Sequence, residues 1–504
     1  MIILNGNNLD LNSFIKVARY NEEVSISEES ILLVNRASEF VEGVVESELP
    51  VYGINTGFGK LSDVSIDKND VGELQKNLLM SHACGVGSPF SDEIVRGMMV
   101  LRINALIKGY SGIKIETLNK LVELLNKNVS PVVFEKGSLG ASGDLAPLSH
   151  MSLPIIGLGE VFYKGKRMDT KDAFLEADIL PIESLRAKEG LSLINGTQAM
   201  TSVGAIAVYD ALRLYKLSNI SLSMTIEATN GIVDAFDPRV HVIRGHLGQI
   251  DAAKEILINL EGSMYTTKQG ELRMQDAYSI RCAPQVHGAT LDALNFVKEK
   301  VEIEMNAVTD NPIIFTEDGI AISAGNFHGE PLAMPFDYLG IAISEMGNIS
   351  ERRIERMVNP SLSNGLPAFL VENPGINSGF MIVQYSAASL VSENKVLAHP
   401  SSVDSIPSSA NQEDHVSMGT IGARKATSIL DNVRKVIAME IFTACQAIDL
   451  RGARKLGNNT QKAYNKVREY IPFIKNDKIM YKYIHTVDDL LVSEELFDSI
   501  FEEE

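Results

Sequence analysis

The segment from Thr201 to Ala228 constrains the fold of this chain more than any other part of the sequence. Its apolar residues lie on most faces of a helix, and its middle carries only Asp210, Arg213 and Lys216 as charges. A helix that is apolar nearly all round belongs in a core. Two further segments, 331–357 and 415–450, also read as long helices. Together they predict a buried helix bundle and a mainly α fold.

Shorter elements surround these segments. The spacing of apolar residues predicts helices over 71–80 and 92–107, and a short strand at 313–315. The region 464–504 reads as polar helical surface. The segment 51–59 holds three glycines within seven residues and is expected to form a loop.

We divide the chain into a loop-rich N-terminal part, 1–200, and a part that holds the helix bundle and a C-terminal helical layer, 201–504. No low-complexity linker separates the two parts in the sequence. We therefore expect them to form one interlocked unit.

The charge balance limits the partners of this protein. The formal net charge is -19, which repels the phosphates of nucleic acids and anionic membrane surfaces. Two stretches of low charge, 190–209 and 373–392, contain polar and helix-breaking residues, so burial in protein is expected rather than a membrane span. We expect no nucleic-acid partner and no membrane partner.

The cysteines and the N-terminus indicate the compartment. Cys84, Cys282 and Cys445 are few and far apart in the sequence, which argues against a disulfide framework and against a zinc site of the CxxC type. The first residues lack the pattern of a signal peptide. A cytoplasmic protein is expected.

The most informative motif runs from Gly137 to His150, with the sequence GSLGASGDLAPLSH. A glycine-rich turn before a helix, with Asp144 as its N-cap, is the ordinary interpretation. The motif lacks the Lys-Ser or Lys-Thr of a phosphate loop and the Gly-x-Ser-x-Gly of a hydrolase elbow.

A chemical interpretation of this motif is more specific. Gly143 has no side chain, so its nitrogen can approach the carbonyl carbon of the small residue Ala141. Ring closure and the loss of two waters would convert Ser142 into part of a 4-methylidene-imidazol-5-one. That group is a strong electrophile, and it forms autocatalytically without an external cofactor.

The motif resembles the signature of the histidine and aromatic amino acid ammonia-lyases. Further blocks recur in the order of that family and extend the resemblance over nearly the whole chain. They are YGINTGFG at 52–59, Ser81-His82, NGTQ at 195–198, QDAYSIR at 275–281, GNFHGE at 325–330 and QEDH at 412–415.

The resemblance implies elimination of ammonia from an amino acid by a carbon–nitrogen lyase. It also implies the long-helix bundle of the ammonia-lyase and fumarase-like type, and a homotetramer in which several chains build each site. The loss of the β-proton needs a positioned base, and amine is a poor leaving group. The resemblance favours capture of the substrate amine by the electrophile over capture of its ring.

The resemblance also assigns roles to individual residues. Tyr52 is the candidate base, and Tyr278 would tune or protonate the electrophile. Arg281 would bind the substrate carboxylate, because its planar guanidinium can donate two parallel hydrogen bonds to a carboxylate. The remaining candidates would contact the electrophile or the substrate; they are Asn195, Gln275, Phe327, His82 and Glu413. Each of these also has an ordinary structural interpretation as a packed or hydrogen-bonded residue.

The block at 412–415 resembles the histidine lyases, so L-histidine is the expected substrate and trans-urocanate the expected product. Glu413 can accept a hydrogen bond from an imidazole, which a phenyl ring does not offer. His82 fits histidine and tyrosine alike, so a tyrosine ammonia-lyase or aminomutase of the same family is the first alternative.

Two more distant alternatives remain. The first is a helical scaffold or binding protein without activity. The second is a fumarase-like lyase, although its Gly-Ser-Ser-x-Met-Pro loop is missing from the sequence. The other histidines show no metal-binding spacing on one helix face, so no metal is expected.

Overall fold

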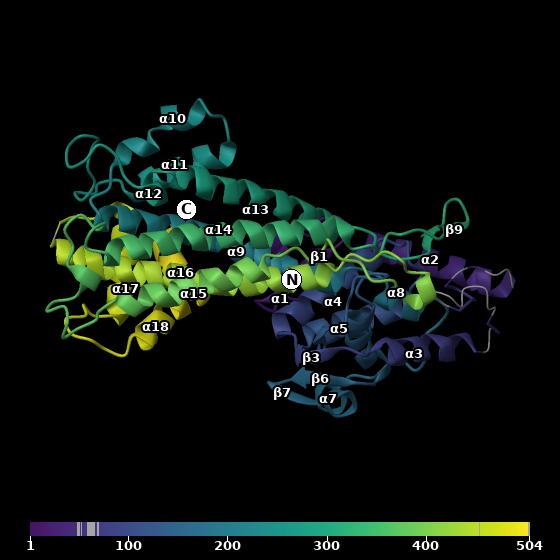
Figure 1. Cartoon of the computed structure of the whole chain (residues 1–504). Helices are drawn as coiled ribbons and strands as arrows, with labels where there is room; N and C mark the ends of the chain where they lie inside the picture. Colours follow the sequence, from purple (N-terminus) through teal and green to yellow (C-terminus); the bar gives the residue numbers. More distant parts are fainter. Residues whose placement is uncertain (48–50, 52, 58–65, 68–69, 453, 502–504) are drawn as a thin grey trace. The chain divides into compact units, whose positions relative to one another are not determined.

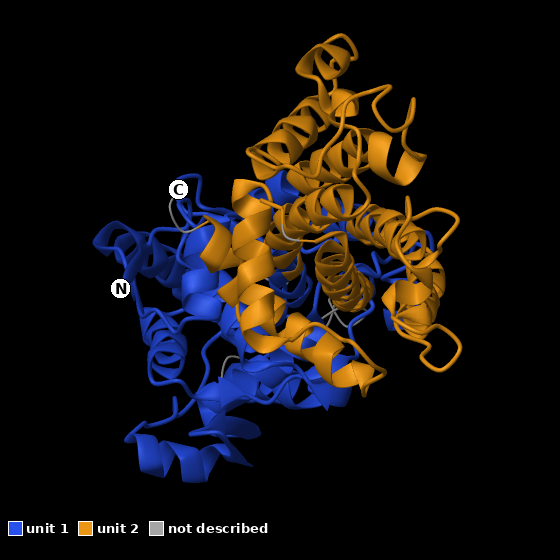
Figure 2. Cartoon of the chain, turned by 90° about the vertical axis from the view of Figure 1, so that its left-hand side faces the viewer, with its two compact units in different colours: residues 1–206, 298–337, 400–424 blue, residues 207–297, 338–399, 425–504 orange. Residues whose placement is uncertain are grey.

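The computed structural model describes residues 1–504 except 48–50, 52, 58–65, 68–69, 453 and 502–504. The fold is mainly helical, with a few short strands (Figure 1), as the sequence predicts. The chain forms two compact units, each built from three separate stretches of sequence (Figure 2). Unit 1 comprises residues 1–206, 298–337 and 400–424, and unit 2 comprises 207–297, 338–399 and 425–504. The division at residue 200 stays a prediction.

The four longest helices among the described residues form the framework of the fold. They are α9 (Gln198–Ala228), α13 (Ala283–Met305), α14 (Glu330–Val358) and α16 (Gly419–Arg451). The helices predicted over 201–228 and 331–357 are confirmed to within a few residues. The third helix begins at Gly419 rather than at His415. Met418 has a left-handed φ of 57°, and this conformation prevents the helix from starting earlier.

The described residues of unit 1 form short helices and four small sheets. Its remaining helices are α1 (Leu11–Ala18), α2 (Glu28–Ser47), α3 (Val71–His82), α4 (Asp92–Leu106), α5 (Ile115–Asn126), α6 (Leu145–Ser152), α7 (Thr170–Ala177) and α8 (Glu189–Ile194). Helix α4 is buried continuously from Val95 to Leu106 and forms part of the core of this unit. The helices predicted over 71–80 and 92–107 correspond to α3 and α4.

The strands of unit 1 pair in short ladders. Strand β1 (Ile2–Leu4) pairs with β2 (Val24–Ile26) in parallel, and the other pairs are antiparallel. These others are β3 (Val86–Pro89) with β5 (Phe134–Lys136), β4 (Ser130–Pro131) with β6 (Glu160–Tyr163) and β7 (Lys166–Asp169), and β8 (Ile313–Phe315) with β9 (Ile320–Ile322). The strand predicted at 313–315 is confirmed as β8.

In unit 2 the long helices lie side by side (Figure 1) and enclose a buried ion pair. Arg353 of α14 donates from Nε to Glu440 Oε1 of α16 at 2.5 Å and from Nη2 to Oε2 at 2.8 Å. Thr225 of α9 and Ser350 of α14 donate to the same carboxylate, at 2.7 and 2.6 Å. The pair is fully buried, and its charges are compensated by these contacts.

Shorter helices complete unit 2. They are α10 (Pro238–Val242), α11 (Leu247–Asn259), α12 (Tyr278–Arg281), α15 (Met381–Leu397), α17 (Asn458–Tyr470), α18 (Met480–Val492) and α19 (Glu495–Phe501). The C-terminal helices are predicted correctly, but the interpretation as polar surface is incomplete. Val487, Leu490 and Leu496 are buried, so one face of these helices belongs to a core.

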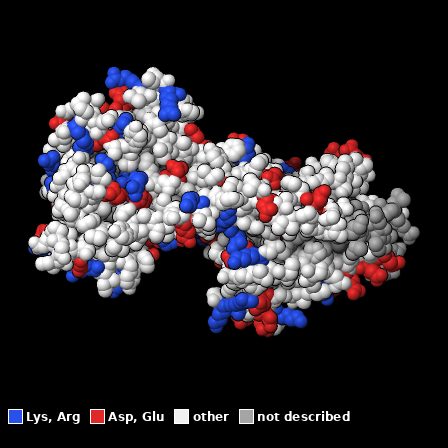
Figure 3. Space-filling model, in the orientation of Figure 1, with Lys and Arg blue, Asp and Glu red and all other residues white. Residues whose placement is uncertain are grey.

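The prediction of burial over 373–392 is confirmed only in part. Val383 and Ala387 of α15 are buried, whereas Ile382 and Tyr385 are 56% and 60% exposed. No helix among the described residues is long and apolar enough to cross a membrane. Acidic and basic side chains are interspersed on the face of the molecule shown in Figure 3.

Candidate active site

The segment Gly140–Gly143 forms a tight turn in unit 1. A short antiparallel bridge joins Gly140 and Gly143, and Ser142 between them has a left-handed φ of 51°. This conformation is uncommon for a residue with a side chain. A side-chain carbon at Gly143 would overlap the carbonyl oxygen of Gly196. Only glycine therefore fits at position 143, and the turn holds Ser142 in a strained backbone conformation.

Asp144 anchors this turn to the start of α9. Its backbone N–H donates to Gly196 O at 2.7 Å, and its buried carboxylate accepts the backbone N–H of Met200 at 2.9 Å. Ser138 Oγ donates to the carboxylate at 2.7 Å, and Thr420 Oγ1 also donates to it. Burial raises the pKa of Asp144, and these hydrogen bonds oppose the rise. Asp144 precedes α6 as predicted, but its side chain caps α9 and makes no capping bond to α6.

Two polar side chains contact Ser142 directly. Asn195, which follows α8, donates from Nδ2 to the carbonyl oxygen of Ser142 at 2.9 Å. The hydroxyl of Ser142 donates to Glu413 Oε1 at 3.0 Å. Ser408 donates to the other oxygen of Glu413 at 3.1 Å, and a backbone bridge between residues 408 and 413 fixes the loop. The structure thus brings together three residues that are far apart in the sequence.

His82 and Phe327 also belong to unit 1. His82 is the last residue of α3 and is half-buried, and its Nδ1 lies 3.0 Å from Ser81 Oγ. Burial lowers the pKa of His82, and the negative charge of Glu413 opposes this. Phe327 lies half-buried in the loop before α14.

The other predicted site residues lie in unit 2 or outside the described residues. Arg281 and Tyr278 share the short helix α12, where the guanidinium lies 4.6 Å from the centre of the Tyr278 ring. Arg281 Nε donates to the backbone carbonyl of Asp276 at 2.9 Å, and Tyr278 is 70% exposed. Gln275 is exposed. Tyr52 lies outside the described residues.

Sequence reasoning did not identify three residues that hold the turn and Glu413 in place. Gly196 could have been identified, because it lies within the NGTQ block and glycine allows a close approach of the backbone. No sequence pattern indicated the roles of Ser408 and Thr420, because these roles depend on contacts formed only in the folded chain.

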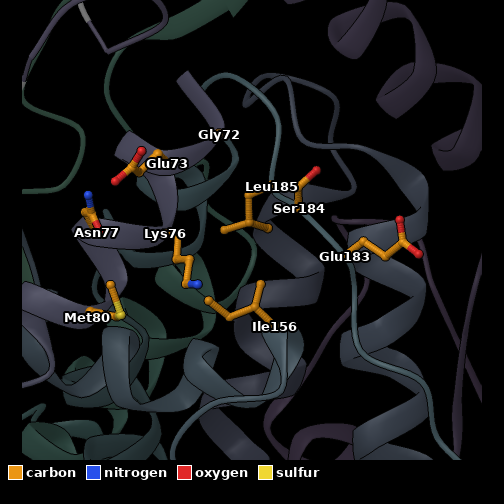
Figure 4. A pocket seen from close by; sticks show the side chains of 9 residues that line it. All are labelled: Gly72, Glu73, Lys76, Asn77, Met80, Ile156, Glu183, Ser184 and Leu185. Carbon is orange, nitrogen blue, oxygen red and sulfur yellow. The ribbon is translucent and has the colours of Figure 1, made fainter. Parts of the chain in front are cut away.

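A separate cavity of about 330 Å³ lies in unit 1 (Figure 4). It is lined by Gly72, Glu73, Lys76, Asn77 and Met80 of α3 together with Ile156, Glu183, Ser184 and Leu185. None of the predicted site residues that the structure describes lines it. Within the described part of the chain, no group of three or more His, Cys, Asp or Glu side chains is placed to hold a metal ion.

Comparison with known proteins places the chain in a family. Residues 9–469 match the sequence model for aromatic amino acid lyases. Histidine ammonia-lyase 1 of Fusobacterium nucleatum subsp. nucleatum is 56% identical over 500 residues, covering 99% of this chain and 97% of that protein. The crystal structure of histidine ammonia-lyase from Trypanosoma cruzi superimposes with a TM-score of 0.92 at 41% identity, over 99% of this chain and 94% of that one.

A third similarity concerns a different activity. The structure of tyrosine aminomutase from Streptomyces globisporus superimposes with a TM-score of 0.96 at 37% identity, covering 100% of this chain and 98% of that one. The described fold is thus shared by a histidine lyase and a tyrosine aminomutase. On the match over residues 9–469 and the identity over nearly the full length, the chain belongs to the aromatic amino acid lyase family.

Proposed function

We propose that this protein is a carbon–nitrogen lyase that eliminates ammonia from L-histidine to give trans-urocanate. The observation that carries this proposal is the strained Ser142, with Asn195 on its carbonyl oxygen and Glu413 on its hydroxyl. Relatives at more than half identity over nearly the full length are named histidine ammonia-lyases, which supports the choice of substrate.

Residues 141–143 fit an electrophile formed from the chain itself. Ala141 is small and 8% exposed, and Gly143 presses against Gly196 where no side chain fits. Once formed, a methylidene-imidazolone supplies an electron sink for breaking the carbon–nitrogen bond. Asn195 would hold its ring oxygen, since that atom is the present carbonyl oxygen of Ser142. No external cofactor is needed for this chemistry.

The unit 1 side chains would recognise the imidazole of the substrate. Glu413 carries a half-buried carboxylate that can accept an imidazole N–H, and an apolar ring would not supply this hydrogen bond. His82 would offer a second polar contact from the end of α3. Phe327 would line the same space.

The remaining candidates would act on the amino acid part of the substrate. Tyr52 would take the β-proton, and Tyr278 would return a proton near the electrophile. Arg281 would bind the carboxylate in two hydrogen bonds, and Gln275 would donate a further one. The exposure of Tyr278 and Gln275 in the single chain is consistent with a site that is completed by other subunits.

We propose a homotetramer in the cytoplasm, with each site built from several chains. Large apolar side chains of unit 2 are exposed in the single chain, including Ile243 at 87%, Leu247 at 74% and Ile382 at 56%. Exposure of this extent is typical of surfaces that pack against another subunit.

The direct test is to incubate the pure protein with L-histidine, L-tyrosine and L-phenylalanine and to follow product absorbance in the ultraviolet. We expect urocanate from histidine and little turnover of the others. Faster turnover of tyrosine would favour a tyrosine lyase or aminomutase, and no product from any of the three would contradict the proposal.

A second test addresses the electrophile. The intact mass of the wild-type protein should be about 36 Da below the sequence mass, for the loss of two waters. The Ser142→Ala variant should keep its fold, as judged by circular dichroism, and lose activity. A Ser142→Ala variant with wild-type rates would show that the electrophile is assigned wrongly.

A further inference from the structure

Arg102 is a fully buried cation in α4 that none of the roles above includes. Its guanidinium donates from Nε to the carbonyl oxygen of Ser192 at 2.9 Å, and Nη2 donates to the same oxygen. Nη1 donates to Thr309 O at 2.8 Å and to Gln198 Oε1 at 3.1 Å. One side chain thus joins Ser192, which precedes the NGTQ block, Gln198, which ends it, and the distant Thr309.

An ion pair lies near Arg102, and the charge of its acidic member favours the charged form of the guanidinium. Lys188 and Asp310 are both fully buried, and Lys188 Nζ donates to Asp310 Oδ2 at 2.7 Å. Burial lowers the pKa of Arg102 to about 10, and the charge of Asp310 opposes this, so the guanidinium remains charged at neutral pH. Such a buried charge is retained only when its hydrogen bonds are satisfied.

Gly196 lies between Arg102 and the strained turn. On one side, a side-chain carbon at Gly196 would overlap Arg102 Nη1 and Gln198 Oε1, and would lie 2.8 Å from Thr309 Oγ1. On the other side, the carbonyl of Gly196 accepts the N–H of Asp144 at 2.7 Å and fills the space where Gly143 would carry a side chain. Arg102 therefore packs against Gly196, and Gly196 packs against Gly143.

We propose that Arg102 is a positioning residue for formation of the electrophile, acting through Gly196 on Gly143. This inference rests on the proposed function. In the first step the nitrogen of Gly143 bonds to the carbonyl carbon of Ala141. The carbonyl oxygen leaves as water with the amide protons of Gly143 and Ser142. In the second step Ser142 loses its hydroxyl and its α-proton as a second water. Both waters come from the chain itself, so no oxidant or co-reactant is required.

The contribution of Arg102 is geometric. Ring closure requires the backbone to stay in a rare conformation, and a position error of about 1 Å can cost about 10²-fold in rate. Gly196 is held on its far side by the planar guanidinium and by Thr309, whose hydroxyl accepts from Gln198 Nε2 at 2.7 Å. A lysine at position 102 would keep the charge but would not bond these separate carbonyls at once.

Arg96 provides a matched control within the same helix. It is 1% exposed, and its guanidinium also donates to two backbone carbonyls and one side-chain amide. These partners are Val17 O, Leu125 O and Asn128 Oδ1, at distances from 2.7 to 3.1 Å. Arg96 thus resembles Arg102 in burial and hydrogen bonding, but its hydrogen bonds go to Val17, Leu125 and Asn128 and not to the segments around Gly196.

The experiment measures maturation, which is the loss of the two waters as the electrophile forms, rather than enzymatic activity. The wild type, Arg102→Lys, Arg96→Lys and Thr309→Val are expressed, translation is stopped, and intact mass is recorded over time, with thermal unfolding in parallel. We expect Arg102→Lys to lose the two waters at least about tenfold more slowly than the wild type, and Thr309→Val to be slowed in the same direction. Arg96→Lys should mature at the wild-type rate even if its thermal stability falls as much as that of Arg102→Lys.

Several outcomes would overturn the inference. It is wrong if Arg102→Lys matures at the wild-type rate, or if both arginine variants are slowed in proportion to their loss of stability. If Arg102→Lys does not fold, wild-type maturation of Thr309→Val overturns it. A wild-type protein that never loses the two waters would contradict the proposed function instead, so the two failures are distinguishable.

Discussion

Asn195 donates its side-chain N–H to the carbonyl oxygen of Ser142 across 2.9 Å. This bond connects the end of α8 to the strained turn in unit 1. Because ring closure would turn that carbonyl into the oxygen of the electrophile, the amide of Asn195 is placed to stabilise negative charge there.

Replacing Asn195 with Ala should lower kcat for L-histidine by about 10²- to 10³-fold, the usual effect of losing one such donor. The urocanate assay measures this effect. Asn348→Ala, which removes an amide donor to Glu345 on α14, serves as the control and should leave kcat unchanged. Wild-type kcat in the Asn195 variant would exclude the stabilising role.

Replacing Glu413 with Gln should lower kcat/KM for L-histidine by about 10²-fold, because the amide removes the charge that favours the imidazole. The exposed Asp404→Asn, in the same loop region, is the matched control. If both variants keep the wild-type value, Glu413 does not recognise the substrate.

His287 should make the protein acid-sensitive. Its Nε2 accepts from Arg353 Nη1 at 3.2 Å, so its Nδ1–H donates to Asn219 Oδ1 at 2.7 Å and the ring is neutral. Burial and the charge of Arg353 hold the pKa of His287 well below 6.5. Below pH 6.5 the unfolded chain therefore binds a proton that the folded chain does not. As the pH is lowered through this range, the free energy of unfolding should decrease by up to about 1.4 kcal/mol per pH unit.

Glutamine at position 287 can accept from Arg353 and donate to Asn219 without taking up a proton. Thermal unfolding of His287→Gln between pH 7.5 and 5.5 should therefore show a smaller loss of stability than the wild type. The exposed His246→Gln should follow the wild-type curve. Identical curves for all three proteins would show that His287 does not set the acid sensitivity.

Breaking the buried pair of Arg353 and Glu440 should be costly. Glu440→Leu leaves the guanidinium unpaired at zero exposure, so the free energy of unfolding should fall by about 3–5 kcal/mol. Adding Arg353→Met should restore most of the loss, as read from denaturant unfolding. The surface pair of Arg239, which is 89% exposed, and Asp237 is the control, and Arg239→Met should have no measurable effect on the free energy of unfolding. A double variant less stable than Glu440→Leu would contradict this account.

The long helices were the most predictable part of the fold. The segment 201–228 is apolar over most of its faces, and this pattern alone indicates a core helix. Helices α13 and α15 were missed, since α13 carries a charged run near Glu299 and α15 exposes Tyr385. The start of α16 was misplaced, because no local pattern indicates the left-handed Met418.

The candidate site was predictable only through its motifs. Ser142, Asn195 and Glu413 each lie in a block that resembles the lyase family, and the fold brings them into contact. The roles of Tyr52, Tyr278 and Arg281 stay predictions. Ser408 and the side chain of Thr420 could not be predicted, because their contacts depend on tertiary packing between distant segments.

The chain crosses between the two compact units inside α9, α13, α14 and α16, and once more between residues 399 and 400. Neither unit is therefore formed by one continuous stretch of the sequence. Separating the units would break the backbone hydrogen bonds of four helices. Exchange of one unit for that of a relative would therefore require breaks inside all four of these helices.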